Sequence, residues 1–302
     1  MPISLPPLPP LSRRRFLGSI AAGMGLVAGR HLYSADAETD ADRYFLLSDT
    51  HIAADAKAAE HGTTMLENLQ QVIGELNKEE KRAASVIVNG DCAYHNGESG
   101  DYQTFLKAIE PVRQRGMPVH LTMGNHDKRE NFWKEIPGQD PARKAVQDRQ
   151  VTLIETPRVN WILLDSLDKT NATPGILGKP QTEWLAKTLD DNAKKPALVM
   201  VHHNPDEKPK VTGLTDTKDL LDVILPRKQV KMLFFGHTHN WEATQREGVH
   251  FVNLPAVAYV FTKGKANGWV DCQLKENSAS LQIHCIDPAH KQHMEKLELP
   301  WR

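Results

Sequence analysis

The segment Val119-His120-Leu121-Thr122-Met123-Gly124-Asn125-His126-Asp127 joins a short apolar run to a glycine, an amide, an imidazole and a carboxylate. Its first three residues have the composition of a strand, and the glycine permits a tight turn after it. Two earlier apolar runs are also followed by polar motifs. Tyr44–Leu47 precedes Asp49-Thr50-His51, and Val86–Val88 precedes Gly90-Asp91. Three predicted strands therefore each end in side chains that can bind a metal ion or transfer a proton.

Between and beyond these strands the chain alternates in character. Apolar residues recur at helical spacing from Met65 to Leu76 and from Tyr102 to Val112. The alternation predicts an α/β protein whose sheet is covered by helices on both faces. Further strands are expected at Trp161–Leu164, Leu198–Val201 and Lys231–Phe235, and further helices at Gln181–Leu189 and Lys218–Leu225.

The pattern changes after His239, where no helix is expected. Four segments there predict antiparallel strands that complete a second sheet: Trp241–Gln245, Val249–Leu254, Gly268–Leu274 and Leu281–Ile286. The stretches Asn125–Arg149 and Asp165–Pro180 contain proline and glycine and are predicted to be surface loops beside a functional site.

Two of the later strands also end in polar motifs, His202-His203 and Gly236-His237-Thr238-His239. Residues just past the carboxyl ends of strands in an α/β sheet converge on one edge. Five strand ends are thus expected to bring seven candidate metal ligands together: Asp49, His51, Asp91, Asn125, His202, His237 and His239.

The chemistry of this set predicts two metal ions. Imidazole and carboxylate without thiolate suit Zn, Mn or Fe. One ion needs three or four ligands, so seven ligands indicate a pair of ions that share a carboxylate. Two ions roughly 3.5–4 Å apart can bind a phosphoryl oxygen and lower the pKa of a bridging water. We therefore expect hydrolysis of a phosphoester by a metal-bridging hydroxide.

Taken in order, the five motifs resemble those of the calcineurin-like metallophosphoesterase superfamily, and the similarity extends over roughly Tyr44 to Pro255. The resemblance implies an α/β fold of four layers, α/β/β/α, in which helices flank a two-sheet β-sandwich. It also implies a first metal on Asp49, His51, Asp91 and His239, and a second on Asp91, Asn125, His202 and His237. Asp91 would then bridge the two ions.

The same resemblance implies a catalytic role for His126, beside the phosphate, where it would donate to a non-bridging oxygen or to the leaving alkoxide. Asp127 would orient His126 or a ligand, and His203 would lie behind the ligands or face the substrate.

The branch of the superfamily is indicated by Gly175-Ile176-Leu177 and by His202-His203-Asn204-Pro205. These segments resemble the branch that contains cyclic-nucleotide and glycerophosphodiester phosphodiesterases. The match departs from that branch because the proline usual at Asn204, or a second proline at Asp206, is missing.

Two alternatives to a phosphodiesterase stay open. Tyr94 follows Asp91 at the spacing of acid-phosphatase-type phosphomonoesterases, although His51 stands where that type usually lacks histidine. A surface binding protein that has lost catalysis would be expected to lose ligands, whereas all seven are present.

The first 37 residues read as an export leader. Arg13-Arg14 followed by Phe16-Leu17 resembles a twin-arginine signal, and the uncharged stretch Phe16–Gly29 is too short to span a bilayer. Ala35-Asp36-Ala37 offers the small residues that a signal peptidase requires. We expect residues 1–37 to engage the twin-arginine machinery and 38–302 to be the exported, periplasmic metallophosphoesterase domain.

Charge argues against a large anionic partner. The chain has 37 Lys+Arg and 38 Asp+Glu, and removal of the leader leaves 33 basic and 37 acidic residues, a net charge of −4. A basic nucleic-acid binder is therefore disfavoured, and a small phosphoester substrate without stable nucleic-acid or membrane binding is expected. Three cysteines leave at least one thiol unpaired, and a bridge between Cys272 and Cys285 is left open.

Overall fold

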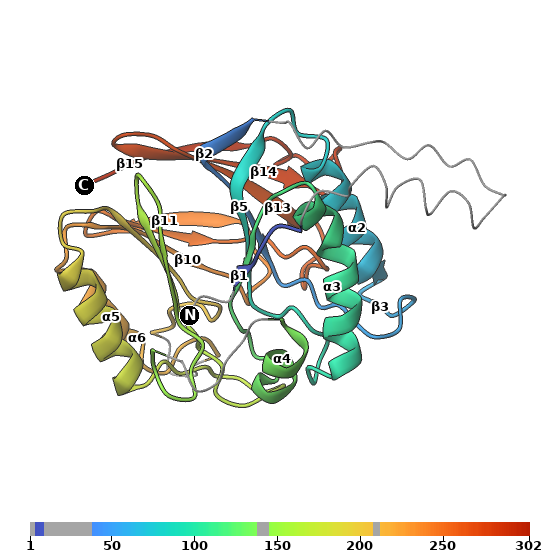
Figure 1. The fold of residues 1–302 in the computed structure, drawn as a ribbon, viewed down its shortest axis with the longest axis horizontal. Coiled ribbons are helices and arrows are strands. Elements are labelled where there is room, and N and C mark those ends of the chain that lie inside the picture. Colours follow the sequence, from blue (N-terminus) through green and yellow to red (C-terminus); the bar gives the residue numbers. More distant parts are fainter. Residues whose placement is uncertain (1–3, 9–37, 138–144, 208–211) are drawn as a thin grey trace.

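The computed structural model describes residues 4–8, 38–137, 145–207 and 212–302, and it places two β-sheets face to face between pairs of helices (Figure 1). In order across the seven-stranded sheet lie β1 (Ser4–Leu5), β6 (Val119–Leu121), β5 (Arg82–Asn89), β2 (Thr39–Ser48), β13 (Gly268–Leu274), β14 (Ser278–Cys285) and β15 (Lys296–Pro300). The six-stranded sheet runs β11 (Glu242–Arg246), β12 (Val249–Asn253), β10 (Val230–Phe235), β9 (Ala197–Met200), β8 (Asn160–Leu163) and β7 (Thr152–Glu155).

Parallel strands occupy the middle of both sheets. β2, β5 and β6 are parallel in the first sheet, as are β8, β9, β10 and β12 in the second. Antiparallel strands flank them. The carboxyl ends of the parallel strands of both sheets meet at the same end of the molecule, where the polar motifs begin.

Each strand alternates between two cores because successive side chains point to opposite faces. In β2, Tyr44 and Leu46 face the second sheet, and Tyr44 contacts Trp161 with ring centroids 5.2 Å apart. Phe45 and Leu47 face the helices α2 (Met65–Leu76) and α3 (Ser99–Gln114).

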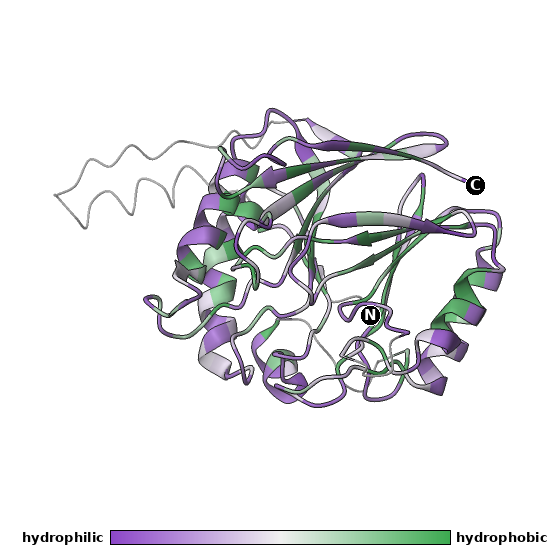
Figure 2. Ribbon diagram, turned by 180° about the vertical axis from the view of Figure 1, so that it is seen from behind, coloured by the Kyte–Doolittle hydropathy of each residue, from purple (hydrophilic) through white to green (hydrophobic). Residues whose placement is uncertain are grey.

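The helices α5 (Lys179–Asp191) and α6 (Thr217–Ile224) cover the outer face of the second sheet. Apolar residues concentrate along the strands and on part of each helix (Figure 2). The predicted four-layer α/β/β/α fold is confirmed.

The late strands depart from the prediction. They are mostly antiparallel, but they are divided between the sheets and do not form a second sheet of their own. β13 pairs with β2, with Val270 opposite Leu46, so β13 to β15 extend the first sheet. β12 pairs in parallel with β10 and completes the second sheet together with β11.

The predicted loops contain more regular structure than expected. The helix α4 (Arg129–Glu135) lies within the stretch 125–149, and only Phe132 of its seven residues is buried, too few for an apolar period. The helix α5 begins at Lys179, directly after Gly178, so the second loop ends before Pro180. A two-stranded hairpin of β3 (Ala59–Glu60) and β4 (Thr63–Thr64) also precedes α2.

A short part of the predicted leader lies on the folded domain. Ser4 and Leu5 pair with β6, with Ser4 opposite His120, and Leu5 is completely buried. The backbone N–H of Leu8 donates to the carbonyl of Arg113. The rest of the leader, including Arg13 and Arg14, lies outside the described residues.

Two further findings concern the described part of the chain. None of its helices combines the length and the apolar character needed to cross a bilayer. Cys92, Cys272 and Cys285 are buried free thiols, so the bridge considered for Cys272 and Cys285 is not formed.

Candidate metal centre

The predicted ligands meet where the strands end. Asp49 follows β2, Asp91 follows β5, Asn125 follows β6, His202 follows β9 and His237 follows β10. In each of three groups, one possible ligand atom per residue lies within 4.8 Å of the others: Asp49, His51 and His239; His51, Asp91 and His126; Asp91, His202 and His237. The two sheets thus contribute to a single cluster.

The backbone at five of these positions is left-handed. The φ angles are 53° at Asp49, 46° at His51, 47° at Asp91, 67° at His237 and 52° at His239. This conformation costs a residue with a side chain roughly 1–2 kcal/mol. Strain of this kind persists where the surrounding structure enforces it, and it concentrates at functional sites.

Glycines next to the ligands leave no room for side chains. At Gly90, where φ is 72°, a Cβ atom would lie 2.5 Å from Nδ1 of His202. At Gly124 a Cβ atom would overlap the carboxylate of Asp91 and lie 2.7 Å from Nε2 of His202. The loops that carry the candidate ligands are therefore packed so closely that a Cβ atom would not fit between them.

Four imidazoles are oriented by backbone carbonyls. The pairs are His126 Nδ1 with the oxygen of His95 at 3.0 Å, His202 Nδ1 with that of Asn89 at 2.9 Å, His239 Nδ1 with that of Tyr259 at 2.7 Å, and His237 Nε2 with that of Thr212 at 3.2 Å. A carbonyl only accepts, so each of these ring nitrogens carries the proton. The other nitrogen is left unprotonated in the neutral ring, as in histidines that bind metals.

Two buried carboxylates lie among these imidazoles. Oδ2 of Asp91 is 3.3 Å from Nε2 of His202 and 3.6 Å from Nε2 of His51, and Oδ1 of Asp49 is 3.3 Å from Nε2 of His239. Burial alone would raise the pKa of Asp91, but the neighbouring His202 holds it well below its usual range. Burial is likewise outweighed at His202, where Asp91 and Asp49 raise the pKa to about 10.

An unsatisfied polar atom indicates that the cluster fits metal ions. Oδ1 of Asn125 is buried and has no hydrogen-bond partner. Buried polar atoms are rarely left in this way, and two buried carboxylates need compensating positive charge. Oxygen and imidazole donors suit Zn, Mn or Fe. Asp91 and His51 each belong to two of the three groups, and of these two residues Asp91 has the carboxylate.

Comparison with known proteins agrees with this geometry. The model of the calcineurin-like phosphoesterase family matches residues 43–241. The chain belongs to the calcineurin-like phosphoesterase family. It is a metal-dependent phosphoester hydrolase, and the family predicted from the five motifs is confirmed.

Relatives within the family include phosphodiesterases. A 3',5'-cyclic adenosine monophosphate phosphodiesterase of Pseudomonas aeruginosa is 26% identical over 244 residues, covering 79% of this chain and 84% of the relative. A protein of Arcobacter nitrofigilis named a probable glycerophosphodiester phosphodiesterase is 29% identical, covering 66% of this chain and 72% of its own. A dimetal phosphatase structure from Danio rerio superposes with a TM-score of 0.66 at 15% identity, covering 86% and 99% of the two chains, and shows the shared fold.

His126 lies beside the candidate ligands His51 and Asp91. Its backbone N–H donates to Oδ1 of Asp91 at 2.8 Å, and its ring lies 5.1 Å from that of His51. Unlike the neighbouring Asp127, it is only partly buried. The position leaves the imidazole next to the candidate ligands and accessible to a substrate.

The remaining motif residues, Asp127 and His203, are both completely buried. Asp127 accepts hydrogen bonds from the backbone N–H of Gly124 at 2.9 Å and of Ala93 at 3.2 Å, and from the hydroxyl of Tyr102 at 3.2 Å. It therefore ties the loop of Asp91 to the loop of Asn125, and no hydrogen bond joins it to the ring of His126 among the described contacts.

His203, the second of these motif residues, is completely buried. Its Nδ1 lies 2.8 Å from Oγ of Ser166, and its ring packs 4.7 Å from that of His237. It therefore connects the segment of Ser166 to the candidate ligand His237.

Tyr94, the residue on which the acid-phosphatase alternative rests, contacts Glu60 and His95. Burial raises the pKa of its phenol, and the carboxylate of Glu60 raises it further. Its ring stacks near that of His95, with centroids 3.8 Å apart. Among the described contacts, none joins the ring of Tyr94 to a predicted ligand, whereas the acid-phosphatase alternative requires its phenol to bind iron.

Two aromatic residues of the site were not predicted. Tyr259 stacks on His51 with centroids 5.2 Å apart, and Phe261 stacks on His239 with centroids 4.2 Å apart. Both lie on the irregular stretch between β12 and β13, which has no periodicity or motif that would single them out. The only relevant sequence feature is their aromatic character.

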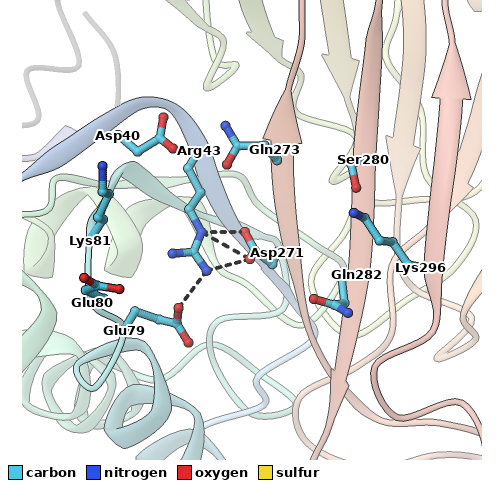
Figure 3. A pocket seen from close by; sticks show the side chains of 10 residues that line it. All are labelled: Asp40, Arg43, Glu79, Glu80, Lys81, Asp271, Gln273, Ser280, Gln282 and Lys296. Carbon is cyan, nitrogen blue, oxygen red and sulfur yellow. Dashed lines mark hydrogen bonds and ion pairs between the residues drawn. The ribbon is translucent and has the colours of Figure 1, made fainter.

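A cavity of about 400 Å³ elsewhere in the molecule is lined by charged residues of the seven-stranded sheet and the loop after α2 (Figure 3). Arg43 bridges Asp271, at 2.6 Å, and Glu79, at 2.7 Å. The predicted ligands are not among its lining residues. Its central cation is already satisfied by two carboxylates, so we assign no site there.

Proposed function

We propose that the protein hydrolyses phosphodiesters at two metal ions, the first held by Asp49, His51, Asp91 and His239 and the second by Asp91, Asn125, His202 and His237. The observation that carries this proposal is the position of Asp91. Its Oδ2 lies 3.6 Å from an imidazole of the first set and 3.3 Å from one of the second. A carboxylate between two sets of donors is the arrangement expected of a bridging ligand.

The roles of the side chains follow from their placement. Metal ions bound here would supply Lewis acidity and lower the pKa of a shared water. The carbonyl of His95 fixes the proton of His126 on Nδ1, so a neutral His126 presents a free Nε2. Protonated at Nε2, the same ring can donate to a phosphate oxygen or to the leaving alkoxide.

Three observations favour a diester over a monoester. The relatives named above include a cyclic nucleotide phosphodiesterase, and the described contacts join the ring of Tyr94 to His95 and to none of the predicted ligands. The acidic net charge of −4 expected after loss of the leader favours a substrate with few charges.

The test is metal analysis of the purified chain together with hydrolysis of two chromogenic substrates. We expect close to two ions of Fe, Mn or Zn per chain, and faster hydrolysis of bis(p-nitrophenyl) phosphate than of p-nitrophenyl phosphate. Trace metal after reconstitution would overturn the dinuclear site. A clear preference for the monoester would overturn the diesterase and favour the phosphatase alternative.

We also propose that the protein is exported through the twin-arginine pathway and cleaved after Ala37. The support is the sequence Arg13-Arg14-Arg15-Phe16-Leu17 and the small residues before Glu38. The exported protein is expected to begin at Glu38 by N-terminal sequencing. Replacement of Arg13 and Arg14 by lysine is expected to leave the precursor inside the cell, and export of that variant at the normal level would refute the proposal.

A further inference from the structure

Phe261 is an exposed aromatic side chain directly beside the candidate metal centre. Among the described residues, Phe261 and Met294 are the large hydrophobic side chains that remain exposed, at 57% and 46%. An isolated exposed hydrophobic residue is ordinary. Phe261 differs because its ring lies on that of His239, with an interplanar angle of 22°.

Further rings extend this surface. Tyr259 is buried next to Phe261, with centroids 5.9 Å apart, and its carbonyl oxygen accepts the Nδ1 proton of His239. His61, from the turn between β3 and β4, contacts both, at 4.8 Å from Tyr259 and 5.8 Å from Phe261. Two segments far apart in the sequence therefore build one aromatic rim, which we define as His61, Tyr259 and Phe261.

We infer that Phe261 is a specificity-determining residue that stacks on a planar ring carried by one ester group of the substrate. This inference rests on the proposed phosphodiesterase function and adds a recognition element to the same site. His239 covers part of Phe261, and the rest of the ring remains open to solvent. An exposed aromatic face next to a candidate metal ligand can bind planar rings, because stacking depends on shape and not on particular hydrogen bonds.

The position of the aromatic rim predicts how the substrate is oriented in the site. The phosphoryl group belongs at the carboxylates and imidazoles, and the ring of one ester group would lie on the side of His239 and Phe261. A phosphodiester with only aliphatic groups would gain nothing from this contact. A nucleobase or an aryl group would gain affinity, which we expect to be roughly tenfold or more.

The first test measures binding and is independent of turnover. Adenosine monophosphate and inorganic phosphate are titrated by calorimetry into metal-loaded full-length protein. The wild type is expected to bind the nucleotide at least about tenfold more tightly, Phe261→Ala to abolish most of that ratio, and Phe261→Trp to keep it. Equal affinities in the wild type, or an unchanged ratio in Phe261→Ala, would overturn the inference.

The second test measures turnover of cyclic adenosine monophosphate and glycerophosphoethanolamine. Phe261→Ala is expected to raise KM for the cyclic nucleotide about tenfold and to leave KM for the aliphatic diester unchanged, with the same metal content. Equal loss on both substrates would show an indirect effect through His239 and would overturn the inference. Met294→Ala removes the other exposed hydrophobic side chain and is the matched control, expected to behave as wild type.

The two proposals fail separately. A wild type that hydrolyses neither diester refutes the proposed phosphodiesterase, whereas the binding ratio of nucleotide to phosphate still decides the role of Phe261.

Discussion

Oδ2 of Asp91 lies 3.3 Å from Nε2 of His202, and both side chains are buried. In the metal-free protein this contact is a buried ion pair, because the carboxylate raises the pKa of the imidazole to about 10. A metal ion would replace the proton on Nε2. Metal binding at this position is therefore expected to release protons at neutral pH.

If Asp91 is shared by both metal ions, its substitution should weaken the binding of both. We expect Asp91→Ala to reduce bound metal from about two ions per chain to fewer than one and to lower kcat by at least about 100-fold. Asp49→Ala is the comparison, because it removes a carboxylate from one set only and is expected to retain one ion. Metal analysis after dialysis distinguishes them, and equal metal content in the two variants would argue against a bridging Asp91.

A side chain at Gly90 is expected to reduce both the stability of the protein and its affinity for metal. Gly90→Ala introduces a Cβ at a φ of 72° and 2.5 Å from the ring of His202. We expect a loss of roughly 1–2 kcal/mol in the free energy of unfolding and at least about tenfold weaker metal binding.

Gly264→Ala is a matched control for this substitution. Gly264 has a similar φ of 83°, and a Cβ there has no neighbour within 4 Å. It should lose less stability than Gly90→Ala, because only the backbone conformation is unfavourable there, and its metal affinity should be unchanged, as measured by urea unfolding and metal titration. If both variants bind metal equally well, the overlap with His202 has no consequence.

Asp127 connects the loop of Asp91 to the loop of Asn125, and loss of this connection is expected to weaken metal binding. Asp127→Asn keeps the shape but replaces one acceptor oxygen with a donor that faces backbone N–H groups. We expect metal affinity to fall about 10- to 100-fold while the protein stays folded. Tyr102→Phe removes only the hydroxyl that donates to Asp127 at 3.2 Å and should have a smaller effect. Equal metal titrations for wild type and Asp127→Asn would refute this role.

The buried imidazole of His120 is expected to make the stability of the protein depend on pH, independently of the metal centre. Burial lowers the pKa of its imidazole from 6.5 to about 4. Between these values the unfolded chain binds a proton that the folded chain does not, so the free energy of unfolding falls as the pH drops through this window. At pH 5 the cost is about 2 kcal/mol.

The experiment compares the unprocessed wild type and His120→Gln, in which Ser4 still lies beside this position, by urea unfolding at pH 7.5 and pH 5. The variant, which cannot titrate, should lose less stability between the two pH values, by about 2 kcal/mol. Parallel losses in both proteins would show that His120 does not contribute to the acid sensitivity.

The sequence was sufficient to predict the parts of the site that follow directly from strand ends. Asp49, Asp91 and Asn125 each stand just past an apolar run, and parallel strands bring their carboxyl ends to one edge whatever their order in the sheet. The four layers were predicted from the resemblance to the family, and local patterns alone predicted only a covered sheet.

Long-range packing explains what was missed. Nothing near β13 indicates that it pairs with β2, because the pairing is decided by which edge remains open after the parallel strands assemble. Phe261 was missed for the same reason, since its proximity to the candidate metal centre results from its contact with His239. α4 was missed because a seven-residue helix with one buried side chain has no period to detect.

The pairing of β1 with β6 means that cleavage after Ala37 would change the surface of the enzyme. Ser4 and Leu5 cover the outer edge of the seven-stranded sheet, so the processed protein would have unpaired backbone N–H and C=O groups along β6. Unprotected edges of this kind recruit strands from other chains. Precursor and processed enzyme are therefore different starting materials for crystallisation and storage, and self-association should be measured on each.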